Sequence, residues 1–331
     1  MVRFTLSRLG SLVVVLFALS VLIFTVSRFG GGDPVRAFVG GNASPEAIAA
    51  ARARLGLDQP LVLQYWDYLT RLVQGDLGLS LSTKRPVADE LGTRIPATAE
   101  LMLATIVLAV VIALVLARGY TMGGRAGSVL RFVLFSAASA PAFLIATGGL
   151  LLFFGQFGWL PVSGRTSYGA SSGLSGMFVL DGLITGNLAY AFDALRHLVL
   201  PATAASLGPA VALARVLADG LSTSMSSGYA RTARSLGETE PQLLRRHGLR
   251  NAAGPAISLL GVQIGMMLSS LVVVEEIFSW NGLGQYLVRA IGAADTNSVA
   301  TISLLLGAVY VVVNTVVDLC LAALDPRVRL S

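Results

Sequence analysis

Residues 101–117 read LMLATIVLAVVIALVLA, a run of seventeen residues without a charged side chain. A helix of this length and composition crosses most of the roughly 30 Å of hydrocarbon in a bilayer, and one more turn completes the crossing. Five other blocks have the same character, at Leu9–Val26, within Phe132–Phe157, and at Leu198–Ala214, Ala252–Val274 and Val299–Val317. The sequence therefore predicts an all-α polytopic membrane protein with about six transmembrane helices.

The composition excludes a soluble protein. Only 13% of the residues are charged and 54% are hydrophobic, whereas an average soluble chain carries roughly 25% charged residues. The net charge of +6 indicates a cytoplasmic membrane surface, because basic residues in so apolar a chain mark that side. We expect membrane lipid, and no nucleic acid, among the partners.

The basic residues set the orientation. The two short loops predicted outside hold only Arg165, Arg196 and Arg289. The segments predicted inside hold many more, which are Arg3, Arg8, Arg118, Arg125, Arg131, Arg215, Arg231, Arg234, Arg245, Arg246, Arg250, Arg327 and Arg329. Since Lys and Arg favour cytoplasmic loops, we expect a multi-pass protein of the cytoplasmic membrane with both termini in the cytoplasm.

Three parts follow along the chain. Residues 1–28 form the first transmembrane helix, which we expect to be retained because no small-x-small cleavage site follows it. Residues 29–97 form a long extracytoplasmic loop with short helices from Pro45 and over Leu61–Val73, lying on the membrane or on a partner. Residues 98–331 form a core with five transmembrane helices. Within it, we expect residues 166–192 to be a re-entrant or surface segment and not a seventh span.

Sites for covalent chemistry are absent from the sequence. Lys84 is the single lysine and is followed by Arg85, so no phosphate-binding loop of the Gly-x4-Gly-Lys-Ser/Thr type exists. His197 and His247 lie fifty positions apart, and no His, Cys or carboxylate cluster has metal-ligand spacing. The predicted spans carry almost no ionisable residue at mid-depth, which argues against a proton-driven carrier. We expect no catalytic residue, metal or cofactor in this chain.

The predicted cytoplasmic loop 219–251 contains a helix, a glycine stop at Gly237 and a second, basic helix. Arg231 and Arg234 lie on the first helix, where they could dock into a groove of a soluble partner. The same charges could instead contact lipid head groups. The residues alone favour neither interpretation.

This loop resembles the coupling loop, or EAA loop, of binding-protein-dependent ABC importer permeases. In the peptide branch it typically reads Tyr-x-Arg-Thr-Ala-Arg-Ala-Lys-Gly and then Arg-His-Ala-Leu-Arg-Asn-Ala-x-x-Pro. The matching positions are Tyr229, Arg231, Thr232, Ala233, Arg234, Gly237, Arg246, His247, Leu249, Arg250, Asn251, Ala252 and Pro255, the last of which we expect to open the next span. The resemblance implies that the first six of these couple the chain to an ATPase.

Further pieces follow in the family's order, among them Gly75–Gly78, Gly158–Gly164, Glu275 to Phe278, Gly282–Gly284 and Asp325–Arg327. They imply a type I ABC importer permease, and the long outer loop implies the B-type subunit of a dipeptide or oligopeptide importer. The implied partners are a homologous C-type permease, two ATP-binding subunits that hold ATP and Mg, and an extracytoplasmic substrate-binding protein. Nickel chelates or another small solute are alternative cargoes. A secondary transporter or a membrane scaffold without transport are alternative classes.

Three positions depart from the family pattern. Gly248 replaces Ala, which should loosen the second loop helix. Glu276 replaces Thr, and Asn281 replaces the Pro usually found before Gly-x-Gly. We expect Glu275, Glu276 and Phe278 at the translocation pathway or outer gate, because an acid at the end of a span is costly in lipid.

Overall fold

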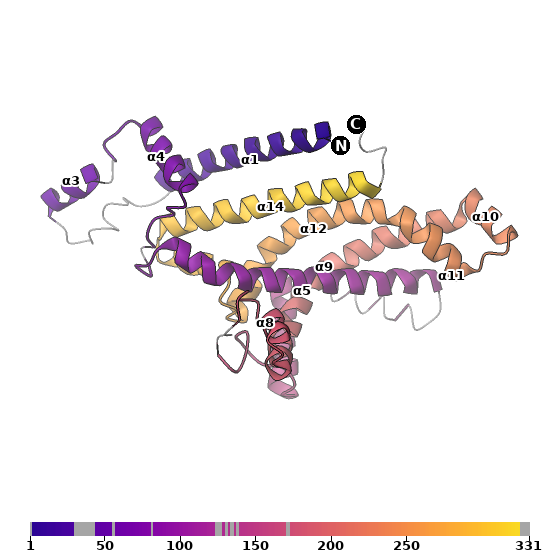
Figure 1. Cartoon of the computed structure of the whole chain (residues 1–331). Helices are drawn as coiled ribbons and strands as arrows, with labels where there is room; N and C mark the ends of the chain where they lie inside the picture. Colours follow the sequence, from indigo (N-terminus) through magenta and orange to yellow (C-terminus); the bar gives the residue numbers. More distant parts are fainter. Residues whose placement is uncertain are drawn as a thin grey trace.

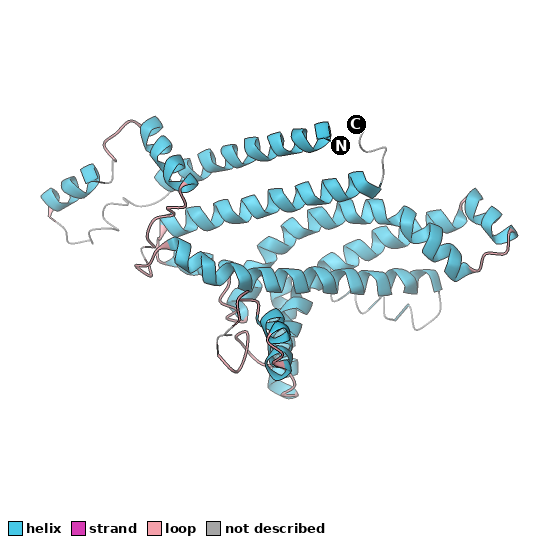
Figure 2. Ribbon diagram, in the orientation of Figure 1, coloured by secondary structure: helices cyan, strands magenta, loops and turns pink. Residues whose placement is uncertain are grey.

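The computed structural model describes residues 2–29, 44–54, 57–80, 82–122, 128, 129, 132, 136, 139–169 and 173–324. Within these residues every regular element is a helix, apart from an isolated bridge between Leu79 and Pro86. Figure 2 shows long helices joined by short loops. The predicted all-α class is confirmed.

Four helices are long and apolar enough to cross a membrane: α5 (Val87–Met122), α9 (Leu188–Ser226), α12 (Leu249–Ile277, continuous with the loop helix before it) and α14 (Thr296–Leu324). Two shorter apolar stretches complete the set. One is Gly10–Val26 within α1 (Val2–Phe29), and the other is α7 (Ala142–Gly149) with the π-helical segment η1 (Leu150–Gln156). All six predicted blocks therefore fall on helices, although part of the third lies outside the described residues.

The core forms where α5, α9 and α12 meet. Around the outer half of α9, the core joins Leu101 of α5 to Met267 and Leu271 of α12. Leu116 and Leu217 anchor a second cluster nearer the other end. Because α9 is buried on most sides, it is the centre of the bundle, while α14 packs against both α1 and α12 at one side (Figure 1).

The start of α1, the end of α14 and the loop predicted as cytoplasmic lie at one end of the bundle. In Figure 1 the start of α1 and the end of α14 are neighbours at this end, which also holds α10 (Gly228–Ser235) and α11 (Glu240–Leu243). The short helices α3 (Pro45–Arg54) and α4 (Leu61–Val73) lie at the opposite end. This arrangement agrees with an even number of crossings.

Two predicted boundaries differ from the structure. The helix α5 begins at Val87, before the expected border at residue 97, because its polar first turns continue the apolar block as one helix. Pro255 was expected to open a span, and this is wrong: it lies inside α12, which continues from Leu249 without a break. A proline in a helix removes one hydrogen bond, and packing of the neighbouring Ala252 and Ala256 against α9 keeps the helix intact.

The described residues of the segment 166–192, which exclude 170–172, form no seventh span. They contain a region of turns, the short helix α8 (Phe178–Ile184) and the first turn of α9, whose start is capped by the Asn187 side chain accepting from the Tyr190 amide. Seven helical residues extend only about 10 Å. The helix α8 is therefore too short to cross the bilayer.

Gly261 and Gly265 make a small-xxx-small pair on α12 that packs within the chain. A Cβ at Gly261 would lie 3.1 Å from Cγ1 of Val317, and one at Gly265 would overlap the ring of Tyr310, both on α14. The pair thus lets α12 and α14 approach closely inside this chain.

We expect Gly265→Leu to push α14 away from α12 and to destabilise the protein by about 1–3 kcal/mol, the usual cost of overpacking. Thermal unfolding of the purified protein measures the loss. Gly254→Leu is the matched control on the same helix, because a Cβ there meets no atom within 4 Å. Equal melting temperatures for the two variants would contradict the close α12–α14 contact.

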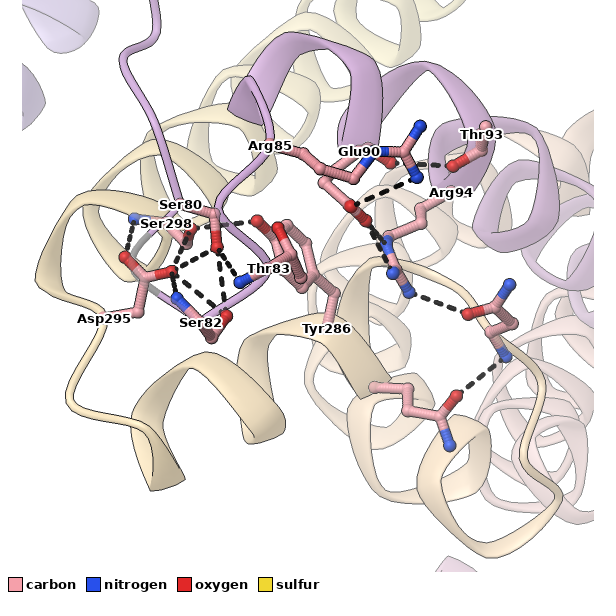
Figure 3. A network of polar contacts seen from close by, with 12 residues as sticks. Ser80, Ser82, Thr83, Arg85, Glu90, Thr93, Arg94, Tyr286, Asp295 and Ser298 are labelled. Carbon is pink, nitrogen blue, oxygen red and sulfur yellow. Dashed lines mark hydrogen bonds and ion pairs between the residues drawn. The ribbon is translucent and has the colours of Figure 1, made fainter.

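The outer loop is fastened to the corner between α13 (Leu283–Gly292) and α14 (Figure 3). Asp295, at that corner, is fully buried. Its Oδ2 accepts hydrogen bonds from the hydroxyls of Ser80 (2.6 Å) and Ser298 (2.7 Å) and from the amide of Ser82 (3.3 Å). Burial opposes ionisation, but these hydrogen bonds outweigh it and hold the pKa of Asp295 below its ordinary value. The Asp295 carboxylate is therefore ionised at neutral pH. Its charged hydrogen bonds to Ser80, Ser82 and Ser298 are lost only in strong acid, when the carboxylate is protonated.

Candidate functional site

The loop between α9 and α12 begins with the short helix α10. Ser227 caps its start, because the Ser227 Oγ accepts the amide proton of Ala230 at 3.3 Å. Ala230 itself is fully buried against the end of α9. One side of α10 is thus held on the bundle, and the other side faces away from it.

Gly237 ends α10 as predicted. Its φ of +90° lies in the left-handed region, where glycine alone is comfortable. The amide of Gly237 donates to the Arg234 carbonyl (3.0 Å) and that of Glu238 donates to the Ala233 carbonyl (3.1 Å). These two bonds make a Schellman stop, so the chain turns sharply at this residue.

The second predicted loop helix is present and runs directly into the membrane span. It consists of α11 and the π-helical segment η2 (Leu244–Gly248), which joins α12. Gly248 is buried, and a Cβ there would lie 3.2 Å from Cδ2 of Leu221 on α9. Gly248, which departs from the family pattern, therefore allows a close contact with α9. It is also the last residue of the π-helical segment η2, whose wider turns differ from those of a regular α-helix.

The exposed side chain of Arg234 folds back onto the loop and braces it. Its Nε and Nη2 donate to the two carboxylate oxygens of Glu240 at 2.6 and 3.2 Å, and its Nη1 donates to the Met225 carbonyl at 3.0 Å. This fork-to-fork pair joins the end of α9, α10 and α11. A charge reversal at Arg234 would therefore disturb the loop itself as well as any docked partner.

Arg231 and Thr232 are the predicted coupling residues that face outward. Both are exposed, and within the described residues the Arg231 guanidinium makes no hydrogen bond or ion pair. Ala233 is half-buried between them and the bundle. A substitution of Arg231 therefore tests partner docking with less disturbance of the loop itself than a substitution of Arg234.

Tyr229 ties α10 to the two spans on either side. Its hydroxyl lies 2.5 Å from Oγ of Ser224 on α9 and accepts a hydrogen bond of 2.7 Å from Nδ2 of Asn251 on α12. The bond with Ser224 lowers the pKa of the Tyr229 phenol. Its ring also lies against that of His247, with centroids 6.1 Å apart. A displacement of α10 thus reaches both spans through one side chain.

We expect Tyr229→Phe to free α10 from the two spans. Each lost hydrogen bond is worth about 1 kcal/mol, so amide hydrogen exchange over residues 228–236 should accelerate roughly fivefold to thirtyfold. The matched control is Thr232→Val, which removes a hydroxyl bonded only to the Gly228 carbonyl of the same helix. Equal exchange in the two variants would show that the hydroxyl of Tyr229 does not hold α10.

At the opposite end of α12, Glu275 holds the turn that leads to α13. Its carboxylate accepts from the Thr98 hydroxyl (2.6 Å) and from the amides of Gly284 (2.7 Å) and Gln285 (3.1 Å). It thereby satisfies the first amides of α13, which have no partner within that helix. A Cβ at Gly282 would overlap this carboxylate, which explains the glycine.

The predicted gate residues are not brought together on one surface. Glu275 and Phe278 are buried within the chain, at 0% and 2% exposure, and their place at the translocation pathway or outer gate stays a prediction. Glu276 is exposed and stays a predicted pathway residue. Asn281 has a φ of +57°, which proline cannot adopt, and its Oδ1 accepts a 2.7 Å bond from Arg94.

Sequence reasoning missed a buried ion pair beside this turn. Nη2 of Arg165 lies 2.5 Å from Oε2 of Glu100 on α5, and both side chains are more than 90% buried. Arg165 also donates to the Gly176 carbonyl (2.8 Å) and stacks over the Phe178 ring, while Glu100 accepts the Val179 amide (2.7 Å). The pair therefore fastens the 157–180 segment to the bundle. Two family-like pieces of the sequence lie at it, Arg94 to Leu101, which contains Glu100, and the adjacent Gly158–Gly164, but neither indicated the pairing.

The comparisons with known proteins cover the whole length of the chain. Residues 107–330 match the family described as "Binding-protein-dependent transport system inner membrane component", and residues 1–102 match the N-terminal part of such membrane components. The chain belongs to this family. It is therefore a multi-pass inner-membrane permease, and the architecture predicted for it is confirmed.

The permease is similar to several curated proteins over nearly its full length. It is 34% identical to the probable D,D-dipeptide transport system permease protein of Escherichia coli K12, covering 97% of this chain and 96% of that one. It is 35% identical to the di/tripeptide transport system permease protein of Pseudomonas aeruginosa UCBPP-PA14 (99% of each chain). It is 32% identical to the glutathione transport system permease protein of Escherichia coli K12 (99% of each chain).

Proposed function

We propose that this permease is the B-type subunit of an ABC importer that brings short peptides into the cell. ATP hydrolysis on two partner subunits drives the transport, and an extracytoplasmic binding protein delivers the cargo. A homologous C-type permease completes the pathway. The observation that carries this proposal is the similarity over nearly the full chain to permeases named for dipeptides, di- and tripeptides and glutathione.

The geometry of the loop 219–251 supports the coupling role. The loop presents Arg231 and Thr232 on a short helix that is capped at one end, stopped by Gly237 at the other, and bonded to α9 and α12 through Tyr229. A push on α10 by an ATPase subunit is then passed to two spans. Such a rigid connection suits alternation between inward- and outward-facing states.

Uptake by the reconstituted complex tests the cargo. We expect ATP-dependent accumulation of a radiolabelled dipeptide or tripeptide, competed by other short peptides and abolished without the binding protein. A nickel chelate serves as the rival cargo. The proposal fails if only the chelate accumulates, or if an ion gradient drives uptake in the absence of ATP.

The orientation is tested by labelling cysteines introduced at Thr83 and Ser235 in a Cys320→Ser background. Both positions are exposed. Thr83 lies between α4 and the start of α5, whereas Ser235 belongs to α10, which lies at the end of the bundle remote from α4. We expect a membrane-impermeant maleimide added to intact cells to label position 83, and position 235 to react only after the membrane is opened. Labelling of position 235 in intact cells would contradict a cytoplasmic coupling loop and cytoplasmic termini.

A further inference from the structure

The helix α4 of the outer loop carries two apolar stripes and one polar stripe. The polar stripe holds Gln64, Asp67 and Arg71. One apolar stripe faces α1 and consists of Tyr65, Tyr68 and Leu72. The second apolar stripe holds Val62, Trp66 and Val73, which are 78%, 66% and 86% exposed. An isolated loop helix in water has no reason to display such a stripe.

The contact between α4 and α1 lies inside the apolar stretch of α1. The ring of Tyr65 packs edge-on against Phe17 and Phe24, with centroids 6.1 and 5.3 Å apart, and Tyr68 packs on Phe24 at 5.7 Å. The hydroxyl of Tyr65 lies 2.8 Å from Oγ of Ser20, which is only 3% exposed. The Ser20 hydroxyl also donates to the Phe17 carbonyl of its own helix (2.7 Å), so Tyr65 is its second partner.

These contacts set the depth of α4 relative to the bilayer. The apolar stretch of α1 ends at Val26. Ser20 lies six residues before that end and Phe17 nine residues before it, which corresponds to about 9 and 13 Å along the helix. A helix lying in the membrane interface buries its apolar face about 5–10 Å into the boundary with the acyl chains. The side chains of α4 that touch α1 therefore reach the depth of an outer leaflet.

The helix α1 also presents exposed apolar side chains near the place where α4 packs on it. Phe17, Val21 and Leu22 of α1 are exposed and belong to a stretch that must contact hydrocarbon. In Figure 1 α4 lies directly on the end of α1 that is remote from the N-terminus and crosses it steeply. Tryptophan and flanking aliphatic residues at such a level are the usual anchors of a membrane interface.

We propose that α4 is an interfacial helix whose Val62–Trp66–Val73 stripe lies in the outer leaflet of the membrane. Lipid, and not the substrate-binding protein, covers this stripe. The polar stripe of Asp67 and Arg71 faces the aqueous side. The embedded helix fixes where the long outer loop leaves the bilayer, because Tyr65 and Tyr68 clamp it to α1.

Spin labels on single cysteines test this placement in the complete transporter, reconstituted in phosphatidylethanolamine–phosphatidylglycerol nanodiscs. Positions 62 and 66 report the exposed stripe, and positions 67 and 71 on the polar stripe are the controls, all in a Cys320→Ser background. We expect the ratio of accessibility to oxygen over a water-soluble nickel chelate to be several times higher at 62 and 66. Adding the binding protein should leave this ratio unchanged.

Two results would overturn the proposal. One is equal ratios at all four positions, which would place the stripe in water. The other is nickel accessibility at 62 and 66 that disappears when the binding protein is added, which would make the stripe a protein-docking surface. A second measurement needs no cysteine: brominated lipids should quench the fluorescence of the native protein more than that of Trp66→Phe, and equal quenching would also count against embedding.

Discussion

Gly237→Val is expected to leave the permease inserted in the membrane while peptide uptake falls at least about tenfold. A β-branched residue at a φ of +90° costs on the order of 1–3 kcal/mol, and a Cβ there meets no atom within 4 Å. The penalty is therefore one of backbone conformation alone. It should release the Schellman stop and misalign α10 with α11, so that the ATPase subunits no longer engage the loop.

The measurement is copurification of the ATPase subunits together with cargo-stimulated ATP hydrolysis and uptake. Leu236→Val is the matched control, because Leu236 is 81% exposed and has an ordinary φ of −86°. Gly237→Asn should give an intermediate loss, since Asn tolerates the left-handed region better than Val does. Normal transport by Gly237→Val, with stoichiometric ATPase, would remove the loop from the coupling pathway.

Arg165→Leu is expected to cause the largest loss of stability, about 3–5 kcal/mol. Removing one member of a buried ion pair leaves the other charge without a partner in a place that water cannot reach. In this variant Glu100 loses its ion-pair partner, and the Gly176 carbonyl loses the hydrogen bond that Arg165 donates. The 157–180 segment should then detach from α5.

Thermal unfolding and the yield of purified protein measure this loss. The control is Arg196→Leu, in which an exposed arginine loses its bond to the Trp159 carbonyl (2.6 Å). That bond lies at the surface and is worth less than about 1 kcal/mol. A melting temperature for Arg165→Leu equal to that of Arg196→Leu would mean that the buried pair does not fasten the segment.

Local features of this permease were readable from its sequence. A helix that crosses the hydrocarbon needs an apolar run of a minimum length, so the length of each apolar run identified a span. In this way the six blocks could be placed on helices. The bounds Leu61–Val73 of α4 and the stop at Gly237 also followed from local rules, because helical periodicity and the left-handed preference of glycine need no distant partner.

Features that depend on distant contacts could not be predicted. Glu275 was assigned to a gate because an acid in a span is costly, and the structure resolves that cost through Thr98, 177 positions away. The ion pair between Arg234 and Glu240 was likewise not readable from the sequence, and a docking role for Arg234 stays a prediction. Whether a charge faces a partner or its own chain is decided by tertiary packing, which a single sequence does not report.

The helix that runs without a break from Glu240 to Ile277 can work as a stiff rod with a compliant joint at one end. Both of its irregular places, η2 and Pro255, lie near the coupling loop. The remainder, from Ala256 to Ile277, is regular over about 33 Å. Bending is concentrated where helices lose hydrogen bonds, so the joint sits at the end of the bundle that holds α10 and α11. If the proposed coupling role holds, a swing imposed there would carry the far end of α12 and the α13 that Glu275 holds as one body, and that end would need no hinge of its own.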